Sequence, residues 1–195
     1  DERGTYIMNS KDLCLLPYLD EVVALGIDSL KIEGRMKSVH YVASVVKAYR
    51  MALDAALSGA PYEVRAEWTE ELGKVSHRAY TTGFFLGKTT VADQIYGSSS
   101  YEQTSDFVGL VRAYDAESGL AAVEQRNNMK LGQEIEIFQP HGASFRQELA
   151  EMWDADGQPI TAAPHPQQIV RIRMMQAVEE NSILRRDVPK KEEVR

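Results

Sequence analysis

The hydrophobic residues of this 195-residue chain follow two different periods, one before residue 60 and another after residue 105. In residues 42–57 apolar side chains recur every three or four positions, which is the spacing of an amphipathic helix. After residue 105 they come in short runs separated by Gly, Pro, Asn and Asp, which is typical of strands joined by turns. This change of period predicts an α/β part followed by an all-β part.

The first 59 residues predict two β/α units. Gly26 suits the end of a helix, because glycine readily adopts the left-handed conformation that follows a helix C-terminus. Ser38 suits a helix N-cap, because its hydroxyl can accept a hydrogen bond from a free backbone N–H. Two units cannot cover both faces of a parallel sheet, so we expect further units upstream of this chain. The expected elements are a strand at 6–8, a helix at 13–25, a strand at 29–33 and a helix from 38 to 57.

The remaining residues predict a connecting segment, a β-domain and a tail. Residues 60–104 are expected to connect the two parts, and the boundary is placed near Ser105. Residues 105–186 predict a small β-barrel, and the charged residues 187–195 predict a disordered tail. The connecting segment is expected to hold a short helix near 68–75, an extended piece at 80–85 and a loop at 97–100. The strands expected in the β-barrel are 107–114, 120–125, 134–138, 145–153 and 168–174.

Composition limits the classes of protein to which the chain can belong. A net charge of −7 argues against a broad surface for polyanions, because phosphate contacts need clustered Lys and Arg. A single cysteine excludes an internal disulfide framework, and no apolar run is long enough to span a bilayer. The N-terminal residues lack the basic and apolar regions of a signal peptide. We therefore expect a cytoplasmic protein with no membrane contact.

Charged residues at the end of the expected strand 29–33 form the first candidate site. Lys31 and Glu33 share one face of that strand, and the carboxyl ends of barrel strands are where active sites are built. Arg35 and Lys37 follow directly at a helix N-terminus, where backbone N–H groups and two cations favour an anion. The alternative is an ion pair between Lys31 and Glu33 beside a solvated basic turn.

Cys14 is the second candidate. Its expected place at the opening of a helix would favour the thiolate that a nucleophile or metal ligand needs. The alternative is a small buried hydrophobic residue, which is the common environment of a lone cysteine. The histidines lie at 40, 77, 141 and 165 without metal-binding spacing, so a zinc site is not expected. Of these, His40 and His77 are better candidates than the two loop histidines.

Several motifs resemble those of one known family. They are the run from Met8 to Cys14, the run from Gly26 to Lys37, Tyr41–Ala43, Lys47–Arg50, Ser76–Arg78, Tyr80–Phe84 and Gln125–Asn127 with Gly132. Together they resemble the last part of the catalytic domain of the collagenase-like peptidases, unassigned peptidase family thirty-two, and the β-domain that follows it. The similarity covers nearly the whole chain.

The resemblance implies a fold: the last β/α units of a TIM-like barrel followed by a small C-terminal β-barrel domain. The long C-terminal extension is similar to the branch that hydroxylates the wobble uridine of transfer RNA, which requires prephenate. That branch implies a four-iron iron–sulfur cluster held by four cysteines, of which Cys14 matches the last. The other three are absent from this chain, so we expect the chain alone to hold no cluster and to be inactive.

We assign an expected role to each of the candidate residues. Lys31 and Glu33 are the expected catalytic residues. Arg35, Lys37 and His40 are expected to bind the substrate, which would be prephenate, another small carboxylate or a phosphate. Because residues 105–186 hold 8 basic and 12 acidic residues, a balance of 8 − 12 = −4, the better phosphate contacts lie in the first part. They are Lys31, Arg35, Lys37, Lys47 and Arg50.

Two other functions remain open. The family name implies a peptidase, although the chain shows neither a cysteine with a general base nor a set of metal ligands. The β-barrel also resembles small modules of translation factors, which implies a non-enzymatic role in docking RNA or a protein.

Overall fold

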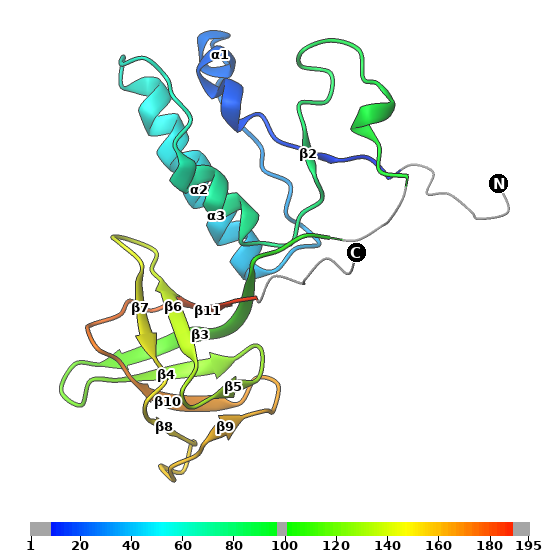
Figure 1. Cartoon of the computed structure of the whole chain (residues 1–195). Helices are drawn as coiled ribbons and strands as arrows, with labels where there is room; N and C mark the ends of the chain where they lie inside the picture. Colours follow the sequence, from blue (N-terminus) through cyan, green and yellow to red (C-terminus); the bar gives the residue numbers. More distant parts are fainter. Residues whose placement is uncertain (1–8, 97–100, 189–195) are drawn as a thin grey trace, which may run out of the picture. The chain divides into compact units, whose positions relative to one another are not determined.

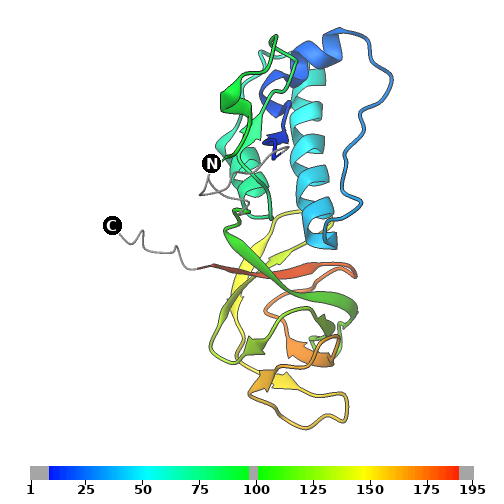
Figure 2. The same cartoon turned by 90° about the vertical axis from the view of Figure 1, so that its right-hand side faces the viewer.

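The computed structural model describes residues 9–96 and 101–188. The chain divides into two compact units, residues 1–103 and residues 104–195, here called unit 1 and unit 2. The strand predicted at 6–8 and most of the predicted tail lie outside the described residues. Figures 1 and 2 show that unit 1 is mainly helical and that unit 2 consists of strands.

Unit 1 is built around its longest helix. The helix α2 begins after Ser38, whose hydroxyl accepts a hydrogen bond from the Tyr41 N–H at 3.2 Å, so the predicted N-cap is confirmed. The short parallel pair of β1 and β2 brings Asp12 beside Tyr80. The elements are β1 (Asp12–Leu13), a 3-10 turn (Leu16–Tyr18), α1 (Leu19–Ala24), α2 (Val39–Leu57), α3 (Ala66–Gly73), β2 (Tyr80–Thr81) and a second 3-10 turn (Val91–Asp93).

The expected helix at 13–25 is shorter than predicted. A 3-10 turn with Pro17 in its first turn comes first, and α1 follows it. Gly26, with φ of +69°, ends α1 as expected. Cys14 therefore does not open a helix but lies between β1 and the 3-10 turn. The predicted place of Cys14 at the opening of a helix was wrong.

The expected strand at 29–33 does not form. The segment runs outside any strand in the described residues, because none of them supplies a partner for its backbone groups. Unit 1 thus shows helices and one two-stranded sheet in its described part, not β/α units of a TIM-like barrel.

Residues 60–103 belong to unit 1 and do not simply connect two domains. The helix α3 packs against α2, and its Trp68 and Leu72 are buried in the same core as Leu16 and Ala52. This burial of apolar surface holds the second half of unit 1 against the first.

Unit 2 contains one antiparallel sheet of seven strands in the order β7-β6-β11-β3-β4-β10-β8 (Figure 1). The sheet has two edges, β7 and β8, so the domain predicted as a small β-barrel is a half-barrel. The side-chain amide of Gln147 on β7 donates to the Arg173 carbonyl at 2.9 Å and accepts from the Met175 N–H at 3.0 Å. The bounds are β3 (Ser105–Asp115), β4 (Leu120–Gln125), β5 (Met129–Lys130), β6 (Glu134–Phe138), β7 (Phe145–Glu148), β8 (Met152–Trp153), β9 (Ala162–Ala163), β10 (Ile169–Arg173) and β11 (Ile183–Asp187).

One central strand of unit 2 was not predicted. The strand β11 pairs with both β3 and β6 and includes Asp187, which was placed in the tail. Its sequence contains Arg185, whose side chain forms two hydrogen bonds to Glu136, at 2.8 and 3.1 Å. Because Arg185 is a charged residue at a buried position, β11 lacks the alternation of apolar and polar residues by which the other strands were predicted.

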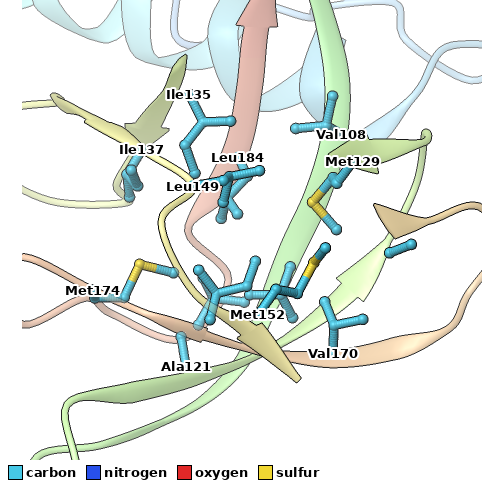
Figure 3. Close-up of a cluster of buried hydrophobic side chains, with 14 of the residues drawn as sticks. Val108, Ala121, Met129, Ile135, Ile137, Leu149, Met152, Val170, Met174 and Leu184 are labelled. Atoms are coloured by element: carbon cyan, nitrogen blue, oxygen red, sulfur yellow. The ribbon is translucent and has the colours of Figure 1, made fainter. Parts of the chain in front are cut away.

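The core of unit 2 lies on the inner face of the sheet. Figure 3 shows Val108, Ala121, Ile137, Val170 and Leu184 pointing into one cluster from five different strands. Because side chains alternate along a strand, the neighbours of these residues lie on the opposite face of the sheet, where some of them, such as Phe138 and Arg185, are also buried.

Candidate functional site

Cys14 lies at the centre of unit 1's candidate site. Its backbone N–H donates to the Thr81 carbonyl at 2.9 Å, which ties it to β2. Its thiol is buried and lines a cavity of about 460 Å³. The other residues that line this cavity are Leu16, Pro17, Tyr18, Thr69, Leu72, Tyr80, Thr81 and Thr82.

Tyr49, from the middle of α2, positions the cysteine. Its hydroxyl accepts a hydrogen bond from the Leu15 N–H at 3.1 Å and donates to Cys14 Sγ at 3.5 Å. Burial, and then the neighbouring Cys14, raise the pKa of Tyr49 well above its usual range. The phenol therefore stays protonated and remains a donor to the sulfur.

An ion pair joins two distant segments beside the cysteine. Arg78 donates to Asp12 through its backbone N–H and through Nε, both at 3.0 Å. Its Nη1 donates to Asn9 Oδ1, also at 3.0 Å. Since Asn9 and Asp12 precede Cys14 by five and two residues, Arg78 fixes the loop that presents the thiol.

Sequence reasoning did not identify Asp12, Arg78 or Tyr49 as site residues. Each lies in a segment that the family resemblance includes, but the resemblance does not say which residues meet. Only the pairing of β1 with β2 brings Arg78 next to Asp12, across 66 positions of sequence.

The predicted catalytic residues line a different cavity. Lys31 and Glu33 border a groove of about 570 Å³ together with Asp12, Lys37 and Tyr49. The groove is otherwise mostly apolar, and its remaining residues are Leu13, Leu15, Leu19, Val22, Leu30, Ile32, Tyr41, Val45, Val46, Arg50 and Leu53. Asp12 and Tyr49 therefore link the groove to the surroundings of Cys14.

Lys31 and Glu33 are themselves strongly exposed. Their side chains are 87% and 73% exposed, and Lys31 Nζ lies 3.7 Å from a Glu33 oxygen. An exposed pair of this kind contributes little to stability. It therefore leaves both groups available at the edge of the groove.

The expected anion-binding residues differ in their surroundings. Lys37 Nζ donates to the Ser76 carbonyl at 2.8 Å and lies 4.9 Å from the centre of the Tyr41 ring and 4.6 Å from that of Tyr101. Through these contacts Lys37 connects its own turn to the segments that hold Ser76 and Tyr101. Arg35 is exposed, whereas His40 is buried within α2. Arg35, Lys37 and His40 thus have three different environments, and their shared role in binding an anion stays a prediction.

Metal-binding side chains do not cluster in the described residues. In residues 9–96 and 101–188 no group of three His, Cys, Asp or Glu side chains could hold a metal ion. In the same residues, no helix is both long and apolar enough to cross a membrane.

Comparison with known proteins identifies the family. A model of peptidase family U32 matches residues 1–95, and a model of the U32 C-terminal domain matches residues 103–185. Both of the units described above are therefore accounted for. The chain belongs to peptidase family U32, which confirms the resemblance inferred from its motifs.

Curated relatives carry two kinds of name. The chain is 39% identical to tRNA hydroxylation protein P1 of Bacillus subtilis, over 95% of this chain and 44% of the relative. It is 36% identical to tRNA hydroxylation protein P of Escherichia coli, over 94% of this chain and 40% of the relative. A collagenase of Porphyromonas gingivalis is 30% identical over 78% of this chain and 37% of its own. The chain thus spans less than half the length of these relatives.

A solved structure matches part of the chain. The C-terminal domain of a Geobacillus thermoleovorans protein assigned to the U32 peptidases has 38% identity and a TM-score of 0.40. It covers 43% of this chain and 93% of its own.

Proposed function

We propose that the protein takes part in the hydroxylation of transfer RNA, with the wobble uridine as the modified base. The similarity that supports this most is the 39% identity to a tRNA hydroxylation protein, which extends over 95% of the chain. We also propose a cytoplasmic location for the protein. We propose prephenate as the required small molecule.

Cys14 would hold one corner of a four-iron iron–sulfur cluster. Three observations fit a ligand: the thiol is buried, it lines a cavity, and it accepts a hydrogen bond from Tyr49. Hydrogen bonds to ligating sulfurs are one of the means by which proteins set the reduction potential of such clusters. A bound cluster would supply one-electron chemistry.

The chain alone is proposed to be inactive. A four-iron cluster needs four thiolates or equivalents, and this chain contains one cysteine. The other three ligands would come from elsewhere in the complete gene product.

The groove beside Lys31 and Glu33 is the proposed site for prephenate. Its wall is mostly apolar, which suits a carbon ring, and Lys31 and Arg50 stand on its border to meet carboxylates. Glu33 is placed to accept a proton. Arg35 is the exposed cation that follows on the next turn.

The test is mass spectrometry of nucleosides from transfer RNA of a strain that lacks the gene. We expect hydroxylated wobble uridine to disappear and to return with the complete wild-type gene but not with Cys14→Ser. Iron and sulfide content of the purified variants separates loss of the cluster from loss of folding. An unchanged nucleoside profile in the deletion strain would rule out the proposal.

The second candidate is a peptidase, which the family description and the name of the collagenase relative favour. Digestion of gelatin by the complete gene product, abolished in Cys14→Ser, would support it. If the complete gene product does not digest gelatin and the deletion strain loses tRNA hydroxylation, only the first candidate function is supported.

A further inference from the structure

We propose that the outer face of strands β8, β10, β4 and β3 in unit 2 binds the phosphate backbone of RNA. We call it the arginine face and define it by Arg112, Arg126, Arg171, Arg173 and Trp153. The inference deepens the proposed function, because transfer RNA is the RNA that this function supplies.

Strand alternation places these side chains on one face. Val170 and Ile172 of β10 belong to the core cluster, so Arg171, which lies between them, and Arg173, which follows Ile172, point outward. Trp153 of β8 is the direct neighbour of Arg171 in the sheet. All four strands lie in succession in the sheet order.

Arg112 of β3 and Arg126, the residue after β4, share one carboxylate. Arg112 donates to Glu124 Oε2 through Nε and Nη2, at 2.8 and 2.6 Å. Arg126 Nη2 lies 2.8 Å from the other oxygen, Oε1. Two guanidinium groups therefore surround a single negative charge, and each keeps N–H groups that the carboxylate does not use.

The arginine face as a whole carries more arginines than carboxylates. Arg173 pairs with Glu151 at 2.7 Å, whereas Arg171 has no salt bridge with any described residue. Asp115, at the end of β3, accepts hydrogen bonds from Glu117 and Ser118 of its own turn. Four arginines thus meet three carboxylates, and one of these carboxylates is already engaged by its turn.

Most carboxylates of unit 2 lie outside the arginine face. Glu134 and Glu136 lie on β6, and Asp187 ends β11; all three interact with Arg146. Other carboxylates lie in turns or on β7. They are Glu117, Glu148, Asp154, Asp156, Glu179 and Glu180. Asp106 lies on β3 and pairs with Arg186 at 2.9 Å. The balance of −4 for residues 105–186 therefore averages regions of opposite sign, and the β-domain can bind a polyanion locally.

Aromatic contact favours RNA over an acidic protein. The guanidinium of Arg173 lies 5.8 Å from the centre of the Trp153 ring. Single-stranded nucleic acids stack their bases on aromatic rings beside a basic surface that follows the backbone. Arginine also binds phosphate through two N–H groups at once.

Three of the cations predicted from the sequence as phosphate contacts already have partners within unit 1. Lys37 donates to the Ser76 carbonyl, and Arg50 forms an ion pair with Asp54 within α2. Lys31 pairs with Glu33. The arginine face instead gathers four guanidinium groups on neighbouring strands, so we place the phosphate backbone there.

The experiment compares two charge-matched double variants of the complete gene product. Arg126→Gln/Arg171→Gln removes two cations from the arginine face, and Lys88→Gln/Lys130→Gln removes two exposed cations elsewhere. Fluorescence anisotropy measures the affinity for an unmodified tRNA transcript over a series of salt concentrations, after circular dichroism has shown that both variants are folded.

We expect weaker binding by the face variant, with a slope of log affinity against log salt reduced by about two, one for each lost phosphate contact. The lysine variant should keep the wild-type slope. Equal slopes in all three proteins would overturn the inference. Competition by poly-glutamate as strong as that by RNA would assign the face to an acidic protein and also overturn it.

The two proposals can fail separately. Lost hydroxylation in the deletion strain with unchanged RNA binding by the face variant contradicts only the arginine face. An unchanged nucleoside profile contradicts the proposed function, whatever the binding measurements show.

Discussion

At the scale of single residues, the site in unit 1 depends on a few polar contacts made across long sequence distances. Arg78 joins Asn9 and Asp12, and Tyr49 joins Leu15 to Cys14. These contacts fix the loop on which the cysteine stands. Changes that keep charge or ring shape while removing one contact therefore test the site without emptying the core.

The first prediction concerns the Arg78 guanidinium. Arg78→Lys keeps the charge but cannot reproduce the two-pronged contact with Asp12 or the bond to Asn9. We expect a loss of about 1–2 kcal/mol in the free energy of unfolding. Urea unfolding followed by Trp68 fluorescence, in a Trp153→Phe background, measures it.

Arg50→Lys is the matched control. Arg50 forms an exposed ion pair with Asp54 one turn along α2, and such pairs contribute only about 0.3–0.5 kcal/mol. Equal losses in Arg78→Lys and Arg50→Lys would mean that the Asp12 contact does not hold the loop.

The second prediction concerns alkaline pH. Burial, and then the nearby Asp20 and Cys14, raise the pKa of Tyr62 to about 12. The unfolded chain, with an ordinary tyrosine pKa of about 10, loses its proton first, so the stability that this residue contributes falls as pH rises from about 10 to 12. We expect Tyr62→Phe to lose less stability over that pH range than the wild type does.

Urea unfolding at a series of pH values provides the measurement. Tyr62 also donates to the Leu16 carbonyl at 2.6 Å, so the variant should be less stable at neutral pH by about 1 kcal/mol. Tyr96→Phe, at an exposed side chain, serves as the control. Identical pH dependence in Tyr62→Phe and the wild type would contradict the prediction.

At the scale of elements, close contacts between strands decide which residues a position accepts. Gly109 lies on β3 between β4 and β11. A Cβ at this position would lie 2.6 Å from Val123 Cγ1, which is too close for any real contact. The close approach of Val123 therefore requires a glycine at this position. The backbone conformation of Gly109 would accept other residues.

The third prediction follows from this contact. Gly109→Ala should destabilise unit 2 by about 1–3 kcal/mol, because the added methyl overpacks the sheet. Removing the opposing methyl groups in Gly109→Ala/Val123→Ala should cost less than the sum of the two single changes. Thermal unfolding followed by circular dichroism gives the three values.

Gly73→Ala is the control for this series. A Cβ there would meet no atom within 4 Å, and the residue lies in α3, where alanine is favoured over glycine. We expect no loss of stability. Simple additivity in the Gly109 and Val123 series would show that the two side chains do not clash.

At the scale of the whole molecule, each unit has a core of its own. The cluster in unit 2 includes fully buried side chains from β3, β4, β6 and β10, and most of them appear in Figure 3. Unit 1 also buries a core, but several large apolar side chains of its described residues remain exposed, among them Leu13, Leu25 and Leu57.

The fourth prediction concerns separate expression of the units. Residues 104–195 alone should unfold in one cooperative transition, because their core needs no side chain from unit 1. Residues 1–103 alone should bind a hydrophobic dye, because apolar surface of this kind promotes association. Differential scanning calorimetry and dye fluorescence provide the readings. A broad, non-cooperative transition for residues 104–195 would contradict the first part.

Where structure depends on nearby residues, the sequence predicted it well. The N-cap at Ser38, the glycine that ends α1 and the bounds of β4 and β6 follow from local spacing and turn chemistry. The family resemblance was also readable from short motifs, and the family models confirm it.

Tertiary structure alone decided the features that require distant partners. Among the described residues, the expected strand at 29–33 has no paired neighbour and stays outside any sheet. By contrast, β11 forms in spite of its charges because β3 and β6 pair with it on both sides. The contact of Arg78 with Asp12 and the gathering of arginines on one face of unit 2 likewise arise only when strands far apart in sequence come together. Local preference selects the elements of this protein, and pairing between distant strands places its charged side chains.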